Sequence, residues 1–182
     1  MRKISWAINA TIDGFADHTA SIPDEELYDF FTNYLNLADV VLFGRKTYQL
    51  MADYWPEAYK DSESTKSEIE FADKYNSISK IVFSKTLNEV TWNNTRLAKN
   101  DLINEVINLK KQDGKNISAG SLSIASQLIK ADLIDEFWFL IHPIILGKGK
   151  QLVENIYSKV NLKLIETKSL NSGVVILHYQ KI

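Results

Sequence analysis

Apolar residues recur along this chain in two spacings, and the two spacings alternate. Short apolar runs that stop at polar or glycine-bearing turns are typical of buried strands, whereas apolar residues three and four apart mark one face of a helix. The short runs predict strands over residues 4–12, 40–43, 80–83, 96–98, 116–119 and 137–146. The wider spacing predicts helices over residues 24–38, 46–52, 61–75 and 101–112, and a further helix that Ser121 caps.

The end of the chain follows a different pattern. Residues 160–169 and 174–182 read as two strands joined through Asn171-Ser172-Gly173, which predicts a closing hairpin. Strands that alternate with helices form a mostly parallel sheet with helices on both faces, and the hairpin would add an antiparallel C-terminal edge. No linker or repeat interrupts the pattern, so we predict a single α/β domain over residues 1–182.

Polar or glycine-bearing turns follow four of the predicted strands directly. In a parallel sheet the carboxyl ends of the strands meet at one edge, and ligands bind outside that edge. We therefore expect these four turns to converge on one ligand site. They are Asp13-Gly14, Gly44-Arg45, Ser84-Lys85 and Gly120-Ser121.

The turn after the second strand carries the clearest chemical signal, in the sequence Gly44-Arg45-Lys46-Thr47-Tyr48. We expect Thr47 to accept a backbone N–H and to start a helix there. Bare backbone N–H groups, a helix N-terminus and two cations at one point favour an anion, most often a phosphate. The alternative is an ordinary strand-to-helix turn whose two cations are solvated.

Composition narrows the function further. The formal net charge of -2 lacks the basic excess of a nucleic-acid surface. There is no cysteine, and the three histidines, His18, His142 and His178, are too scattered for a zinc site. We see no signal peptide and no apolar run of ~18 residues, the length that spans a bilayer. These features predict a cytoplasmic protein with no nucleic-acid or membrane partner.

Four segments, in this order, resemble the dihydrofolate reductase superfold, and more closely the reductase domain of the bifunctional riboflavin-biosynthesis deaminase-reductase. The resemblance implies a three-layer fold, NADPH as hydride donor, and a small heterocyclic substrate of the pterin, folate or pyrimidine-ribose type. We expect no deaminase half, because its metal-binding Cys and His are missing from these 182 residues. The segments are Asn9-Ala10-Thr11-Ile12-Asp13-Gly14, Phe43-Gly44-Arg45-Lys46-Thr47-Tyr48, Trp92-Asn93-Asn94-Thr95-Arg96, and residues 133–149 from Leu133-Ile134-Asp135-Glu136 to Gly147-Lys148-Gly149.

The resemblance also implies a set of cofactor-binding residues. Gly44, Arg45, Lys46 and Thr47 match the turn at the pyrophosphate and the adenosine ribose phosphate. Ser84 and Lys85 match the pair at the 2′-phosphate, which favours NADPH over NADH. Asn9 and Ala10 match the backbone beside the nicotinamide. The remaining matches are Ala119, Gly120, Ser121 and Leu122, at the turn before a helix that approaches the pyrophosphate.

Ala119 departs from the family, which has two glycines at this turn. The departure places a methyl group where the family has none, and we expect it to crowd the dinucleotide. In the family the bond between the paired glycines is cis, so we also expect the Ala119–Gly120 bond to be cis.

Two carboxylates are candidates for proton supply or substrate binding. Glu26 falls near the position of the carboxylate that dihydrofolate reductases carry on their first long helix, and Asp13 is a candidate for binding a substrate hydroxyl. The alternatives stay open: an acidic first turn complements the helix dipole, and Asp-Gly is a common turn. Trp55 could wall the pocket or simply pack, and His142 could reach the pocket floor or sit in the core.

The leading interpretation is an NADPH-dependent oxidoreductase that reduces a small heterocycle. The alternative is a catalytically weak or inactive nucleotide-binding module on the same fold, and a third possibility is a scaffold with an empty cleft. The closing hairpin carries apolar residues on both of its alternating sets, including Ile176 and Leu177. An edge strand that is apolar on both faces needs cover, so we also predict a homodimer.

Overall fold

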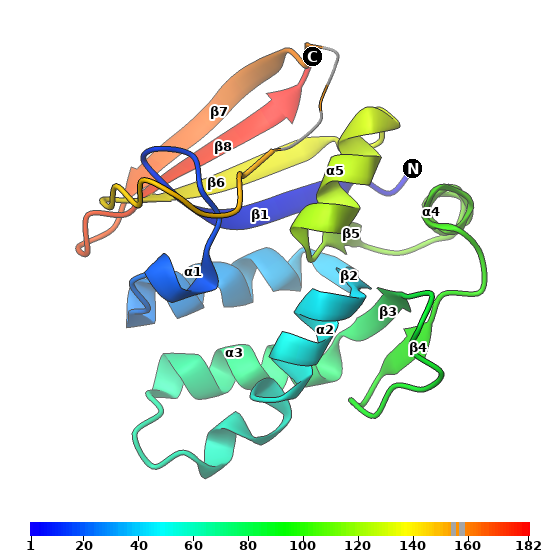
Figure 1. Cartoon of the computed structure of the whole chain (residues 1–182), viewed down its shortest axis with the longest axis horizontal. Helices are drawn as coiled ribbons and strands as arrows, with labels where there is room; N and C mark the ends of the chain where they lie inside the picture. Colours follow the sequence, from blue (N-terminus) through cyan, green and yellow to red (C-terminus); the bar gives the residue numbers. More distant parts are fainter. Residues whose placement is uncertain (154–155, 157–158) are drawn as a thin grey trace.

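A computed structural model of the chain describes residues 1–153, 156 and 159–182, and within them the strands form one eight-stranded sheet (Figure 1). The strand order is β4-β3-β2-β5-β1-β6-β8-β7. The strands are β1 (Ile4–Thr11), β2 (Ala38–Gly44), β3 (Ser79–Phe83), β4 (Thr95–Leu97), β5 (Asn116–Ala119), β6 (Glu136–His142), β7 (Leu162–Ser169) and β8 (Val175–Lys181). The helices are α1 (Glu25–Asn36), α2 (Arg45–Ala52), α3 (Lys66–Ser77), α4 (Leu102–Lys110) and α5 (Leu122–Lys130), with 3-10 turns η1 (His18–Ala20) and η2 (Trp55–Lys60).

The pairing of the strands confirms the predicted fold class. From β4 to β6 every neighbouring pair is parallel, whereas β8 runs antiparallel to both β6 and β7. The carboxyl ends of β1, β2, β3 and β5 therefore lie at one edge of the sheet. The four turns singled out in the sequence follow these strands, so the fold gathers them at that edge.

Each face of the sheet has its own apolar layer, and strand β2 shows why. Val40 and Leu42 pack into the layer under α4 and α5, whereas Val41 and Phe43 pack into the layer that includes α1 and α3. Successive side chains of a strand point to opposite faces, so a strand covered on both faces must be apolar throughout. Figure 1 shows α1 and α3 on one side of the sheet and α4 and α5 on the other.

A buried lysine closes the end of α3. The Lys80 Nζ donates to the carbonyl oxygens of Tyr75 at 2.7 Å and Ile78 at 2.8 Å, and lies 4.4 Å from the centre of the Trp92 ring. Lys80 is 1% exposed, and this burial lowers the pKa of its ammonium to about 8. The cation caps the negative end of the helix.

Some element boundaries differ from the sequence predictions. The expectation that Thr47 starts α2 is wrong, because the extended backbone of Gly44 precedes a helix that begins at Arg45. Helix α3 begins later than expected, after Thr65, whose hydroxyl accepts the Glu68 N–H. Strand β6 ends at His142, since Pro143 has no N–H for the ladder.

The peptide geometry at Ala119–Gly120 also differs. The expectation of a cis bond is wrong, because no cis peptide bond occurs in the described part of the chain. The trans form is the ordinary one for a bond without proline. Among the described residues, no helix is both long enough and apolar enough to cross a membrane.

Candidate functional site

Two adjoining cavities, each about 340 Å³, lie at the carboxyl edge of the sheet. The helix-end cavity is lined by the first turns of α2 and α5, and the aromatic cavity by side chains of α1, α3 and η2. The residues that line both cavities are Asn9, His18, Phe31, Leu50 and Met51. The two cavities therefore form one cleft that is polar at one end and aromatic at the other.

The helix-end cavity receives two helix N-termini that lack a capping side chain. Lys46 and Thr47 of α2 line it, as do Ser121 and Leu122 at the start of α5. The Ser121 hydroxyl does not cap its own helix, because it accepts the Gly44 N–H at 2.9 Å. Uncapped first-turn N–H groups carry partial positive charge and bind anions.

The other three α-helices in the described residues each have a side-chain cap at the N-terminus. Asp24, Thr65 and Asp101 each accept a backbone N–H of the first turn of α1, α3 and α4. The missing caps are thus confined to the two helices that open into the cavity. The difference between the two groups of helices supports an anion as the ligand at this end.

Cations line the helix-end cavity as well. Lys46 and Lys150 border it, and Lys150 was not singled out in the sequence because it lies far along the chain in an irregular loop. Arg45 does not line the cavity, and its Nη1 donates to Gln49 Oε1 at 3.0 Å on the outer side of α2.

Gly120 and Ala119 lie in different surroundings at the turn after β5. Gly120 lines the cavity, and a Cβ added to it would lie 2.5 Å from Val41 Cγ1 and 2.8 Å from Phe43 Cε1. Ala119 is 1% exposed and packs in the core under α4 and α5. The methyl group of Ala119 therefore points away from the cleft, contrary to the expectation that it would crowd a dinucleotide there.

Asn9 stands at the junction of the two cavities, held by a buried histidine. The Ile22 N–H donates to His142 Nδ1 at 3.1 Å, and His142 Nε2 lies 3.1 Å from Asn9 Oδ1. Burial lowers the pKa of His142, with a smaller opposing effect from Asp24. His142 is thus a core residue with partners for both ring nitrogens, and it also neighbours the cleft through Asn9. Each of the two roles considered for it from the sequence holds in part.

The aromatic cavity could hold a flat ring. Trp55 lines it and also packs edge-on against Phe71, with 4.7 Å between ring centres. Tyr28 lines it too, and burial raises the pKa of its phenol to about 12, so the hydroxyl stays protonated. No carboxylate occurs among the described residues that line this cavity.

The two predicted carboxylates lie outside both cavities and have backbone partners. Glu26 Oε2 accepts the Asn171 N–H at 2.7 Å, which ties α1 to the turn between β7 and β8. Asp13 accepts the Thr11 hydroxyl at 2.6 Å and the Gly147 N–H at 2.7 Å, and these bonds lower its pKa.

Other predicted cofactor residues also lie apart from the cleft. Ser84 accepts the backbone N–H groups of Thr86 and Leu87, and neither Ser84 nor Lys85 lines either of the two cavities of the cleft. Ala10 is 3% exposed within the sheet. His18, in contrast, lines both cavities, and sequence reasoning considered it only as a metal ligand.

Two loops that are far apart in sequence are bonded together beside the cleft. The Ala16 N–H donates to the Lys150 carbonyl at 2.7 Å, the Leu152 N–H donates to the Gly14 carbonyl at 2.9 Å, and Phe15 pairs with Gln151. The Asp13 carboxylate adds its bonds to the same pairing. We call residues 12–17 and 144–152 the paired loops.

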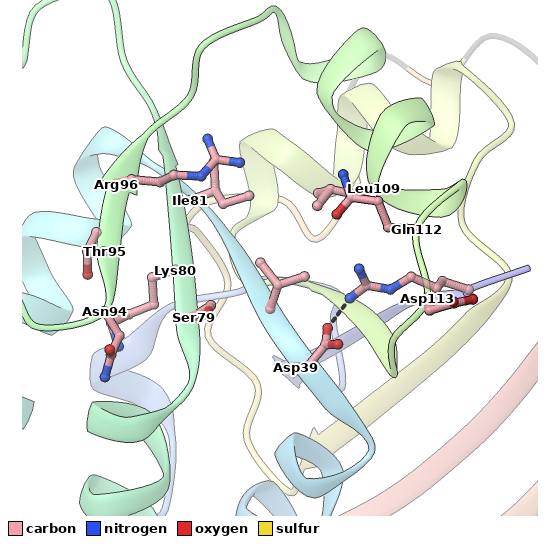
Figure 2. Close-up of a pocket in the computed structure, with 12 residues that line it drawn as sticks. Asp39, Ser79, Lys80, Ile81, Asn94, Thr95, Arg96, Leu109, Gln112 and Asp113 are labelled. Atoms are coloured by element: carbon pink, nitrogen blue, oxygen red, sulfur yellow. Dashed lines mark hydrogen bonds and ion pairs between the residues drawn. The ribbon is translucent and has the colours of Figure 1, made fainter.

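A third hollow, of about 590 Å³, lies at the opposite edge of the sheet (Figure 2). It is lined at the amino ends of β2 and β3, and both of its arginines already have carboxylate partners. Arg2 pairs with Asp39, and Arg96 pairs with Glu105. Both pairs leave little charge for a ligand, so we place the candidate site in the cleft.

Comparisons with known proteins show what this chain is similar to. The chain is 35% identical over 182 residues to the uncharacterized protein YyaP of Bacillus subtilis strain 168, covering 98% of this chain and 94% of that protein. A pyrimidine reductase-like protein from Corynebacterium diphtheriae superposes with a TM-score of 0.69 at 18% identity, over 100% of this chain and 92% of its own.

Dihydrofolate reductase from Enterococcus faecalis, solved in complex with NADP(H), has the same fold, with a TM-score of 0.64 at 11% identity over 98% of this chain and 96% of its own. The family described as RibD C-terminal domain matches residues 2–176, which is nearly the whole chain. This match shows that the chain belongs to the RibD C-terminal domain family.

Proposed function

We propose that this protein is an NADPH-dependent reductase of a small planar heterocycle, of the pterin, folate or pyrimidine-ribose type. The observation that carries the proposal is the cleft itself: two uncapped helix N-termini and two lysines at one end, and an aromatic cavity at the other, joined at Asn9. A dinucleotide has an anionic pyrophosphate and a flat reactive ring, so its chemistry matches this order of groups.

The residues at the polar end fit the phosphates of such a cofactor. The first-turn N–H groups of α2 and α5 and the ammonium groups of Lys46 and Lys150 would hold the pyrophosphate. Gly120 has no side chain and lines this cavity with its backbone. NADPH supplies the hydride when it is bound, and the protein contributes orientation and exclusion of water.

The aromatic end fits a flat substrate. Tyr28, Trp55 and Tyr75 offer ring faces and edges, and Asn9 offers a polar contact next to the helix-end cavity. A carboxylate is missing from this end in the described residues, so the proton would come from water or from His18 or Asp17 at the mouth. We assign the two predicted carboxylates, Glu26 and Asp13, a structural role, which is to hold loops in place.

The missing carboxylate is also the observation that favours the second candidate function. A protein that binds NADPH through the helix-end cavity but lacks a positioned proton donor would be a nucleotide-binding module with weak or no turnover. The two candidates share the cofactor and differ only in whether the hydride is transferred.

The test has two stages. Quenching of tryptophan fluorescence, with Trp55 as a reporter in the cleft, measures the binding of NADPH and NADH. Loss of cofactor absorbance in a panel of dihydrofolate, pterins and pyrimidine-ribose phosphates then measures turnover.

Lys46→Ala should weaken NADPH by roughly tenfold or more, since one charge-assisted contact contributes about 1.5–3 kcal/mol. Lys163→Ala, at an exposed position of β7, is the matched control and should bind like the wild type. Binding without turnover on any substrate would favour the nucleotide-binding module, and no binding at all would reject both candidates.

A further inference from the structure

The buried chain of bonds from Ile22 through His142 to Asn9 fixes more than the position of the asparagine. A backbone N–H can only donate, so His142 Nδ1, which receives the Ile22 N–H, must be unprotonated. The neutral imidazole then carries its hydrogen on Nε2, and this hydrogen must go to Asn9 Oδ1 at 3.1 Å. The tautomer of His142 thereby dictates which end of the Asn9 amide faces the histidine.

The topology of the sheet makes this arrangement rigid. Asn9 and Thr11 lie on β1 opposite Leu140 and His142 of the parallel strand β6. His142 is 1% exposed, and burial lowers its pKa, so its neutral form is favoured. A proton on Nδ1 would also face the Ile22 N–H, so two donors would meet and the hydrogen bond between them would be lost.

With its oxygen engaged, Asn9 has only its NH2 group left for the cleft. Within the described part of the chain, Asn9 Nδ2 has no protein acceptor, and Asn9 lines both cavities. We propose that Asn9 is a specificity-determining hydrogen-bond donor at the junction of the cavities, where it selects a carbonyl oxygen on a planar ring, and that His142 is the positioning residue that keeps the amide in this orientation.

Two ligands could bring such a carbonyl to the junction: the carboxamide of the nicotinamide and a lactam carbonyl of the substrate ring. The inference rests on the proposed function, and its experiment separates the two sources. One arm measures the Kd for NADPH by tryptophan fluorescence. The other measures the Kd for a pterin in the presence of saturating NADP⁺.

Asn9→Asp keeps the acceptor for His142 and replaces the donor with a negative oxygen. We expect this variant to lose affinity about tenfold or more in the arm that contains the contacted carbonyl, since a lost hydrogen bond and the new repulsion act together. Loss in the first arm alone identifies the carboxamide, and loss in the second alone identifies the substrate carbonyl. Unchanged affinity in both arms would overturn the inference.

Two variants of His142 test the positioning role. The side-chain nitrogen of Gln reaches the place of Nε2, so His142→Gln should still donate to Asn9 and retain affinity within about twofold. The shorter Asn mimics Nδ1, so His142→Asn should keep the Ile22 bond, release the Asn9 amide and lose affinity about fivefold. Equal affinities for the two variants would show that His142 only fills space.

A measurement on the wild-type protein without ligand tests the inference even if a variant fails to fold. Nitrogen-15 NMR of the wild-type protein should show His142 neutral with its proton on Nε2. A proton on Nδ1 would overturn the assignment of the amide. Absence of NADPH binding by the wild type, with the Nε2 tautomer intact, would instead reject the proposed function.

Discussion

Gly120→Ala tests whether the shape of the cleft depends on the packing beneath it. The new methyl carbon would lie 2.5 Å from Val41 Cγ1, and 2.8 Å and 3.0 Å from two carbons of the Phe43 ring. Both neighbours are fully buried on β2, at 0% exposure, and β2 is fixed by β3 and β5 on its two sides. None of these contacts is the free end of a flexible side chain, so the backbone of the turn must shift.

The magnitude follows from opposing contributions. Overpacking a filled core costs about 1–3 kcal/mol, and replacing a glycine recovers about 0.4–1 kcal/mol by restricting the unfolded chain. We therefore expect the free energy of unfolding to fall by about 1–2 kcal/mol, which corresponds to roughly 2–4 °C in Tm for each kcal/mol in a domain of this size.

Urea unfolding of single and double variants provides the assay. Val41→Ala removes the nearest methyl group, so it should cost at least ~0.5 kcal/mol less in the Gly120→Ala background than in the wild type. Gly44→Ala is the matched control: its methyl group would meet the Ser123 Oγ at 2.6 Å, but that hydroxyl can rotate away. The reasoning fails if Gly120→Ala is as stable as Gly44→Ala, or if the two substitutions in the double variant simply add.

Three further predictions concern charge, cofactor choice and assembly. The pKa of Lys80 is about 8 in the folded protein, so between pH 7 and 9.5 this residue binds fewer protons in the folded chain than in the unfolded chain. The free energy of unfolding of the wild type, relative to that of Lys80→Met, should therefore rise by up to about 2 kcal/mol over this pH range in urea titrations. A difference that stays flat with pH would contradict the lowered pKa. Lys85 lies outside both cavities, so we expect it to meet the 2′-phosphate of a cofactor that extends past the helix-end cavity to the turn after β3. Lys85→Ala should then weaken NADPH by about 1.5–3 kcal/mol and leave NADH unchanged in fluorescence titrations; equal loss for both would remove the 2′-phosphate assignment. The exposed strand β7, with Leu164 49% and Ile165 47% exposed, leads us to expect a homodimer, and a light-scattering mass near 20.8 kDa at micromolar protein would refute it.

The order of strands and helices could be predicted from sequence because each element carries its own periodic signal. The run 40–43 is apolar at every position, which a strand covered on both faces requires, and the structure places it inside the sheet between β3 and β5. The gathering of the polar turns at one edge of the sheet could be predicted from the parallel pairing of the strands alone. The closing hairpin in the sequence predicted the antiparallel edge, and the family resemblance added the three-layer fold.

Side-chain direction at the site could not be predicted in the same way. Ala119 and Gly120 are neighbours, yet the Ala119 methyl group packs under α4 and α5, whereas a Cβ at Gly120 would meet Val41 and Phe43 in the layer on the other face of the sheet, because successive residues point to opposite faces. Asp13 and Glu26 looked like catalytic acids because sequence does not show which backbone N–H groups will reach them. Lys150 and His18 enter the cleft from loops, where no periodicity marks them.

The paired loops have a consequence for motion. Because Ala16 and Leu152 donate across the pairing and the Asp13 carboxylate bonds to Gly147, neither loop can leave its place without breaking the bonds of the other. The paired loops bring Asp17 and Lys150, more than a hundred positions apart, to one cavity, and we expect the two loops to open as one unit. Amide hydrogen exchange at Ala16 and Leu152 should therefore proceed through one shared opening event, with the same protection and the same response to Asp13→Asn.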